Sequence, residues 1–133
     1  MVVDASVVVR WFVEQPGHER AKAWMARFID DDESLVGPDL LSFEVFGALC
    51  RLQPPRSPDW AARSHAHFVE LGMRLLPTEP ALFERAAVLS RTLKIAGYDA
   101  VYLAHAEQLG VPWLTADARV LRRLAGDRRA RAL

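Results

Sequence analysis

The chain has 133 residues, about half of them hydrophobic, and its 17 basic side chains are balanced by 17 acidic ones. This size and composition fit a single domain with a buried core, and they exclude an intrinsically disordered chain or a uniformly basic nucleic-acid binder. The charge is uneven, because six arginines lie between residues 119 and 131. We therefore expect one domain, residues 1–133, with an acidic body and a basic C-terminal segment.

Short apolar runs alternate with segments of helical periodicity along the chain. Strands are predicted at the start of the chain, up to Asp4, and at residues 34–38, 73–78 and 111–115. Helices are predicted at residues 6–17, 18–32, 39–52, 57–72, 79–95 and 99–110, with Pro16-Gly17 separating the first two. Residues 53–59 are interpreted as a surface loop, and the final ARAL as a poor edge strand.

None of these strands is followed by a hairpin turn, so the connections between them are crossovers. The predicted fold is therefore α/β, with a central, mostly parallel sheet of four to five short strands flanked by helices. Cys50 is the only cysteine, so an intrachain disulfide is excluded, and no signal-peptide pattern opens the chain. The apolar runs are also far shorter than the ~20 residues of a membrane-spanning helix. We expect a cytoplasmic protein without a membrane partner.

Three aspartates stand where strands end or helices begin. Asp4 closes the first strand, Asp117 follows the fourth, and Asp99 opens the helix that precedes the fourth strand. The carboxyl ends of parallel strands meet at one edge of a sheet, where ligands bind. Glu44 borders the apolar face of the helix predicted at residues 39–52. The pattern predicts four acids at one edge.

Taken singly, each aspartate also fits a structural role, Asp99 and Asp117 as helix caps and Asp4 as a turn residue. Taken together, four acids without a matching set of internal basic residues would repel one another unless a cation lay between them. Ligands that offer only oxygen atoms select Mg²⁺ or Mn²⁺ over zinc. Such an ion coordinates phosphate oxygens and activates a bound water, so the pattern favours phosphodiester hydrolysis as the function.

Two hydroxyl residues and three arginines are further candidates. Ser6 and Thr115 each lie two residues from one of the aspartates and could hold a water or the scissile phosphate, or make structural turn bonds. Arg119, Arg122 and Arg123 follow Asp117 and could bind an RNA backbone, or form a solvated helix face. No glycine-rich nucleotide-binding loop is present.

Four stretches resemble, in order, the motifs of the PIN-domain ribonucleases, in particular the small VapC-type toxins of prokaryotic toxin–antitoxin pairs. These stretches are VVDASVVVRWF, PDLLSFEVFGAL, YDAVYLAHAEQLG and WLTAD, and together they span nearly the whole chain. The resemblance implies a single PIN-like domain that hydrolyses RNA, inhibition by a cognate antitoxin, and a homodimer. It also implies that Mg²⁺ or Mn²⁺ is held by Asp4, Glu44, Asp99 and Asp117.

Two residues depart from the pattern of these relatives. Gly47 stands where many relatives carry a small polar residue, often Asn, and Arg119 stands where many carry a further acid. The second departure favours one metal ion over two. It also keeps open the alternative of a catalytically weak PIN-like module that binds RNA or a protein. A phosphoacceptor signalling domain, a third interpretation, lacks its central strand ending in Asp.

A set of large apolar residues near the N-terminus exceeds what two short helices need. We interpret these residues as part of a groove for an antitoxin or a second subunit. They are Val8, Trp11, Phe12, Trp24, Phe28 and Ile29.

Overall fold

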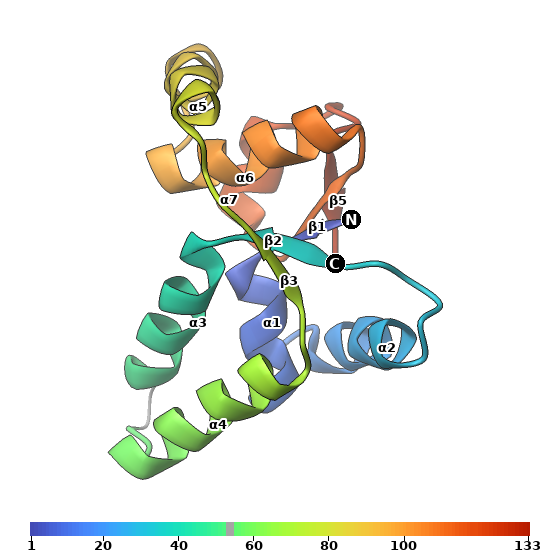
Figure 1. Cartoon of the computed structure of the whole chain (residues 1–133), viewed down its shortest axis with the longest axis vertical. Coiled ribbons are helices and arrows are strands. Elements are labelled where there is room, and N and C mark those ends of the chain that lie inside the picture. Colours follow the sequence, from blue (N-terminus) through green and yellow to red (C-terminus); the bar gives the residue numbers. More distant parts are fainter. Residues whose placement is uncertain (53–54) are drawn as a thin grey trace.

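The computed structural model of the chain describes residues 1–52 and 55–133, in which seven helices accompany five short strands (Figure 1). The strands are β1 (Val2–Val3), β2 (Val36–Pro38), β3 (Arg74–Leu76), β4 (Trp113–Thr115) and β5 (Ala130–Ala132). The helices are α1 (Ala5–Phe12), α2 (His18–Ile29), α3 (Leu40–Cys50), α4 (Pro58–Glu70), α5 (Pro80–Leu93), α6 (Gly97–Leu109) and α7 (Ala118–Arg123).

The strands form one sheet in the order β3-β2-β1-β4-β5, and every neighbouring pair is parallel. The α/β prediction is confirmed, and the sheet is wholly rather than mostly parallel. The central strand β1 is buried, with Val2 opposite Val36 on one side and Trp113 on the other. Helices α1 to α4 lie on one side of the sheet, and α5 and α6 lie on the other (Figure 1).

The C-terminal residues form a better strand than their sequence predicts. Residues 130–132 pair with β4 along its whole length, and the backbone N–H of Leu133 donates to the carbonyl oxygen of Thr115 at 3.0 Å. The exposed side chains of this segment suit an edge strand, because an edge needs backbone partners on one side only. The expectation that ARAL is a poor edge strand was therefore wrong.

The predicted loop at residues 53–59 falls partly outside the described residues, which omit 53 and 54. Where the description resumes, Ser57 caps α4, and its hydroxyl accepts a hydrogen bond from the backbone N–H of Trp60 at 3.1 Å. In the described part of the chain, no helix is long and apolar enough to cross a membrane.

The apolar residues near the N-terminus do not form one groove. Val8 and Trp11 belong to the core, with exposed fractions of 0% and 3%. Phe12, Trp24 and Phe28 are half-buried against that core, and Ile29 alone is well exposed, at 55%. Two of the six residues expected at a docking surface are therefore inaccessible, because α1 packs between the sheet and its neighbouring helices.

Candidate acidic active site

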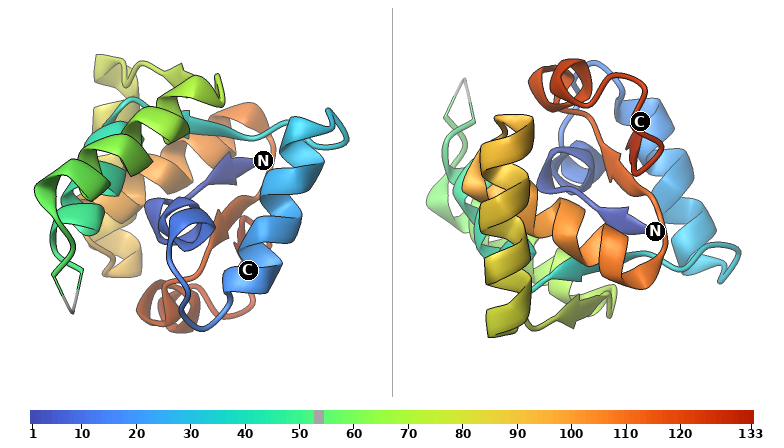
Figure 2. Two further views of the ribbon diagram at one scale, coloured as in Figure 1. Left: turned by 90° about the horizontal axis from the view of Figure 1, so that it is seen from below. Right: turned by 90° about the horizontal axis from the view of Figure 1, so that it is seen from above.

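The four predicted acids line a single pocket of about 440 Å³. Asp4 directly follows β1, and Asp117 lies two residues beyond β4; these strands are neighbours in the sheet and lie side by side in the middle of the molecule (Figure 2). Asp99 comes from the first turn of α6, and Glu44 comes from the middle of α3. The parallel sheet thus places four acids from separate parts of the chain at its carboxyl edge, as the sequence predicts.

Two of the aspartates also cap helices. The Asp4 carboxylate accepts a hydrogen bond from the backbone N–H of Ser6 at 2.6 Å and caps α1. The Asp117 carboxylate accepts from the backbone N–H of Arg119 at 2.7 Å and caps α7. Asp99 differs, because it lies inside the first turn of α6 and its carboxylate reaches back to the backbone N–H of Ala96, the residue that precedes the helix. All three aspartates therefore contact the backbone at a helix start, Asp4 and Asp117 as the cap residue itself and Asp99 from the first turn.

Glu44 is held in place from α6. The Tyr102 hydroxyl donates to Oε2 of Glu44 at 2.6 Å, and the buried Tyr102 ring stacks on Trp113 with centroids 5.7 Å apart. The sequence reasoning missed Tyr102. The signal was its position three residues after Asp99, on the same face of the helix.

Burial and mutual repulsion shift the titration of these acids. Burial raises the pKa of Asp4 and of Glu44. Burial, together with the charges of Asp4 and Asp117, raises the pKa of Asp99 to about 6. Burial acts in the same direction on Asp117, but hydrogen bonds from Arg119 and Val120 lower its pKa overall. Three of the four carboxylates are thus poorly compensated by the protein itself.

The two hydroxyl candidates make structural hydrogen bonds. The Ser6 hydroxyl accepts from the backbone N–H of Ala116 at 2.9 Å, and the Thr115 hydroxyl accepts from that of Asp117 at 3.1 Å. The two hydroxyl oxygens lie 3.5 Å apart. Ser6 also lines the acidic pocket, whereas Thr115 is fully buried. These contacts join the end of β4 to the start of α1, which fixes the loop that carries Asp117.

Three arginines line the same pocket, but two of them are exposed, so the acids have no matching set of internal basic residues. Arg10 donates to the carbonyl oxygens of Ser6 and Pro16. Arg119 forms an ion pair with Asp117, with Nη2 to Oδ2 at 3.2 Å. The third is Arg51. Helical spacing predicts the position of two of them. Arg10 lies four residues after Ser6 and Arg51 lies seven after Glu44, so each shares a helix face with a pocket residue.

The three arginines expected to bind RNA gather around a neighbouring pocket of about 620 Å³. Arg122 and Arg123 line it together with Lys94, and Arg119 belongs to both pockets. The acidic and the basic pocket also share Asp99 and Asp117. A basic surface therefore adjoins the acidic centre directly.

The donor set of the acidic pocket fits a hard divalent cation. All four candidate ligands are carboxylates, and three have raised pKa values, which a bound cation would lower. Among the described residues, no group of three His, Cys, Asp or Glu side chains is already arranged to hold a metal ion. Instead, Asp4, Asp117 and Glu44 each accept hydrogen bonds from the protein. The donor chemistry thus fits a hard cation, although the hydrogen bonds to these three carboxylates come from the protein and only partly offset their burial.

Several solved structures share this fold. A structure described as a toxin-antitoxin complex from Klebsiella pneumoniae has a TM-score of 0.71 and 15% sequence identity, covering 98% of this chain and 94% of that one. PAE2754 from Pyrobaculum aerophilum has a TM-score of 0.71 and 24% identity, with coverages of 98% and 88%. FitAcB from Neisseria gonorrhoeae has a TM-score of 0.65 and 19% identity, with coverages of 92% and 91%.

No curated protein sequence matches the chain. The family model of the PIN domain, in contrast, matches residues 1–127. That match spans every residue that lines the acidic pocket, from Asp4 to Arg119. The chain therefore belongs to the PIN domain family.

Proposed function

We propose that this protein is a metal-dependent endoribonuclease, with one nuclease domain spanning residues 1–133 and Mg²⁺ or Mn²⁺ as cofactor. The observation that carries the proposal is the convergence of four acids from α3, α6 and two strand ends on one pocket. The pKa values of Asp4, Glu44 and Asp99 are raised, so a positive charge in the pocket would stabilise their ionised forms. Hydrolysis of RNA phosphodiester bonds is the chemistry that such a site supports best.

Asp4, Glu44, Asp99 and Asp117 would hold the cation. When bound, such a cation would make an activated water available at neutral pH and would offset negative charge on the phosphate. Tyr102 orients Glu44, and Ser6 and Thr115 hold the strand ends that carry the aspartates.

The basic pocket is where we place the rest of the substrate. Arg119, Arg122 and Arg123 would bind the RNA backbone, because guanidinium groups pair with phosphate oxygens and the pocket opens beside Asp99 and Asp117. A single strand could pass from this surface over the acidic centre.

The biological role that we propose is the toxin of a type II toxin–antitoxin pair, of the VapC type. One of the structures that share the fold is described as a toxin-antitoxin complex. The proposed partners are a cognate antitoxin and a second copy of the chain. Either would cover apolar side chains that are exposed, such as Phe43 on α3 and Phe83 on α5.

A second candidate is a catalytically weak PIN module that binds RNA or a protein without cutting. Arg119 favours it, because its ion pair with Asp117 places a positive charge beside a carboxylate that a cation would otherwise bind. Its charge also acts on Asp99. The two candidates differ in whether RNA is cut.

Incubation of purified protein with single-stranded RNA, in Mg²⁺ or Mn²⁺ and in chelator, tests the proposal. The nuclease should cut only with metal, and Asp4→Asn, Glu44→Gln, Asp99→Asn and Asp117→Asn should each lose activity because each removes a ligand charge. Unchanged cutting in chelator, with contaminating nuclease excluded, would refute metal dependence. Binding without cutting under every condition would establish the weak module instead.

A further inference from the structure

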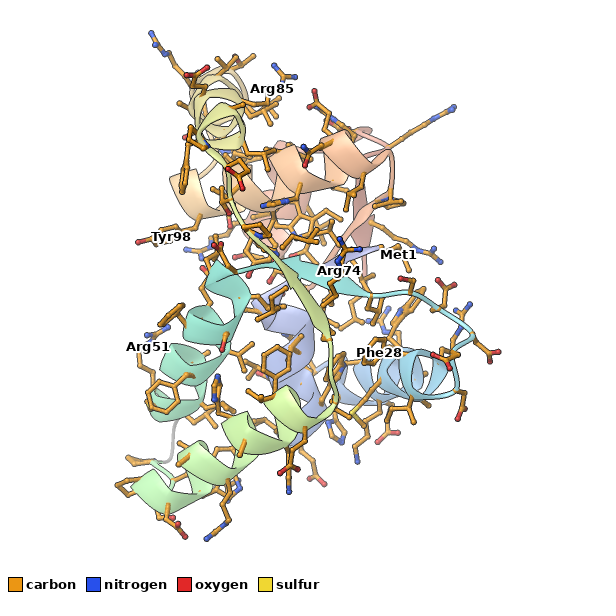
Figure 3. The ribbon with its side chains drawn as sticks, viewed as in Figure 1. Met1, Phe28, Arg51, Arg74, Arg85 and Tyr98 are labelled. Carbon is orange, nitrogen blue, oxygen red and sulfur yellow. The ribbon has the colours of Figure 1, made fainter. Side chains whose placement is uncertain are left out.

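Arg51 folds back over its own helix. It follows the last residue of α3, and its side chain lies along that helix (Figure 3). A Cβ atom built on Gly47 would lie only 3.0 Å from Nη1 of Arg51 and 3.8 Å from its Cζ. The guanidinium therefore occupies space that Gly47 leaves open, one turn before Arg51 itself.

The Arg51 guanidinium faces the acidic pocket without a direct partner. Among the described residues it makes no hydrogen bond or ion pair, although its charge acts to lower the pKa of Glu44. The other two arginines of the pocket are engaged, Arg10 by carbonyl oxygens and Arg119 by Asp117. Among the described residues, Arg51 is therefore the pocket guanidinium with no protein partner, so all of its donors are available to a ligand.

The charges of the pocket indicate what that ligand is. Four carboxylates and three guanidinium groups line it. The carboxylates repel an anionic substrate, so a phosphodiester needs a donor that reaches past them. Guanidinium presents a planar fork that matches two phosphate oxygens and stays charged at every relevant pH. Arg51 meets these requirements from the wall formed by α3.

We propose that Arg51 binds the phosphodiester that lies over the acidic centre, and that Gly47 is the residue that admits Arg51 to the pocket. This role rests on the proposed function for the identity of the substrate. It makes Gly47 part of substrate binding, since a Cβ there already requires the guanidinium to shift and a longer side chain would displace it.

Binding of a fluorescent single-stranded RNA in chelator tests the role apart from catalysis. Arg51→Ala should weaken binding about tenfold or more, the usual effect of losing a hydrogen bond to a charged group. Arg51→Lys should recover part of the loss, because it restores the charge without the fork. Arg20→Ala removes an equal charge from α2, outside this pocket, and should leave binding close to wild type.

The link between the two residues is tested by a double-mutant cycle. Gly47→Asn should weaken binding in wild type but have no further effect when combined with Arg51→Ala, because there is then no guanidinium to displace. Thermal melting of each variant checks that the fold is intact, which we expect because Arg51 is exposed.

Equal affinities of Arg51→Ala and Arg20→Ala would overturn the proposal, as would full additivity of Gly47→Asn and Arg51→Ala. Cleavage by wild type in Mg²⁺, measured on the same RNA, is scored separately. If RNA binding depends on Arg51 but no cleavage occurs, the nuclease proposal fails and the phosphate-binding role of Arg51 stands. If cleavage occurs but Arg51→Ala binds and cuts RNA as well as Arg20→Ala does, the role of Arg51 fails and the nuclease proposal stands.

Discussion

The aspartates of the acidic pocket combine structural and chemical roles to different degrees. Asp4 and Asp117 cap helices through backbone N–H groups, so their side chains would stand at these positions in a site without metal as well. Asp99 is not a cap residue, although it accepts a hydrogen bond from the backbone N–H of Ala96 at the start of α6. Its carboxylate is half-buried and sits close enough to Asp4 and Asp117 for their charges to raise its pKa. Replacing Asp99 therefore measures the combined cost of burial and of repulsion from Asp4 and Asp117.

We expect Asp99→Asn to stabilise the protein in chelator at pH 7. The pKa of Asp99 is raised from 3.8 to about 6, so ionising this carboxyl costs stability as pH rises between those values. After allowance for solvent screening, the gain for Asp99→Asn at pH 7 is on the order of 1–2 kcal/mol. Melting temperatures of both proteins in chelator should coincide near pH 4 and separate toward pH 7.

Asp117→Asn is the matched control, with the opposite sign. The pKa of Asp117 is lowered by hydrogen bonds from Arg119 and Val120, so its ionised form stabilises the fold at pH 7. Asn caps a helix about as well as Asp, so the variant loses only the charge. It should melt below wild type at pH 7. A stabilising Asp117→Asn, or a neutral Asp99→Asn, would contradict this electrostatic account of the pocket.

At this scale, the sequence located the acids but not the other polar residues of their pocket, such as Arg51 and Tyr102. Strand ends and helix starts mark Asp4, Asp99 and Asp117, because the parallel sheet fixes where they go. Arg51 and Tyr102 carry only a helical spacing as signal, and that spacing fits a solvated face or a core face equally well. Whether such a residue faces solvent or the core depends on how α3, α6 and β4 pack together. The periodicity of the sequence does not contain that information.

At the scale of elements, apolar runs and turn residues predicted most strands and helices, but they did not predict β5. Its sequence has weak strand character, and its position depends on contacts around Arg129. The Arg129 guanidinium donates to Asp127 and to Glu107, and Glu107 also pairs with Arg85 of α5. This network ties the C-terminal segment to α5 and α6, so long-range pairing rather than local propensity forms β5.

We expect Glu107→Gln to destabilise the fold by about 1 kcal/mol, because it removes the charge that two arginines share. The side chains are partly exposed, so the loss should shrink at about 1 M salt, where screening is strong. Urea unfolding at low and high salt measures both quantities. Glu84→Gln, an exposed α5 variant for which no ion pair occurs among the described residues, should change little. If Glu107→Gln and Glu84→Gln lowered the free energy of unfolding equally, the network would have no stabilising role.

At the scale of the whole molecule, the neutral net charge conceals two adjoining surfaces of opposite character. The acidic pocket and the basic pocket share Asp99, Asp117 and Arg119, so the boundary between them runs through α7. The sequence indicates this division only as an acidic body and a basic C-terminal segment. The fold adds Lys94 from the end of α5 and brings both surfaces together at one sheet edge.

We expect the double variant Arg122→Ala/Arg123→Ala to bind single-stranded RNA more weakly and with a flatter dependence on salt. Each phosphate contact to a single strand contributes about 0.7 to the slope of log affinity against log salt concentration, so loss of two contacts should lower that slope by about 1.4. Fluorescence anisotropy in chelator, over a range of salt concentrations, measures the slope without cleavage.

The control removes two positive charges from another face. Arg20 and Lys22 are exposed on α2 and line neither pocket, so Arg20→Ala/Lys22→Ala has the same net charge as the test variant. If overall charge alone governed binding, the two double variants would share one reduced slope. If the basic pocket carries the RNA backbone, only Arg122→Ala/Arg123→Ala flattens it, because counterions are released where phosphates actually contact the protein. If neither double variant changed the salt dependence of RNA binding, Arg122 and Arg123 would belong to a solvated helix face that does not contact RNA.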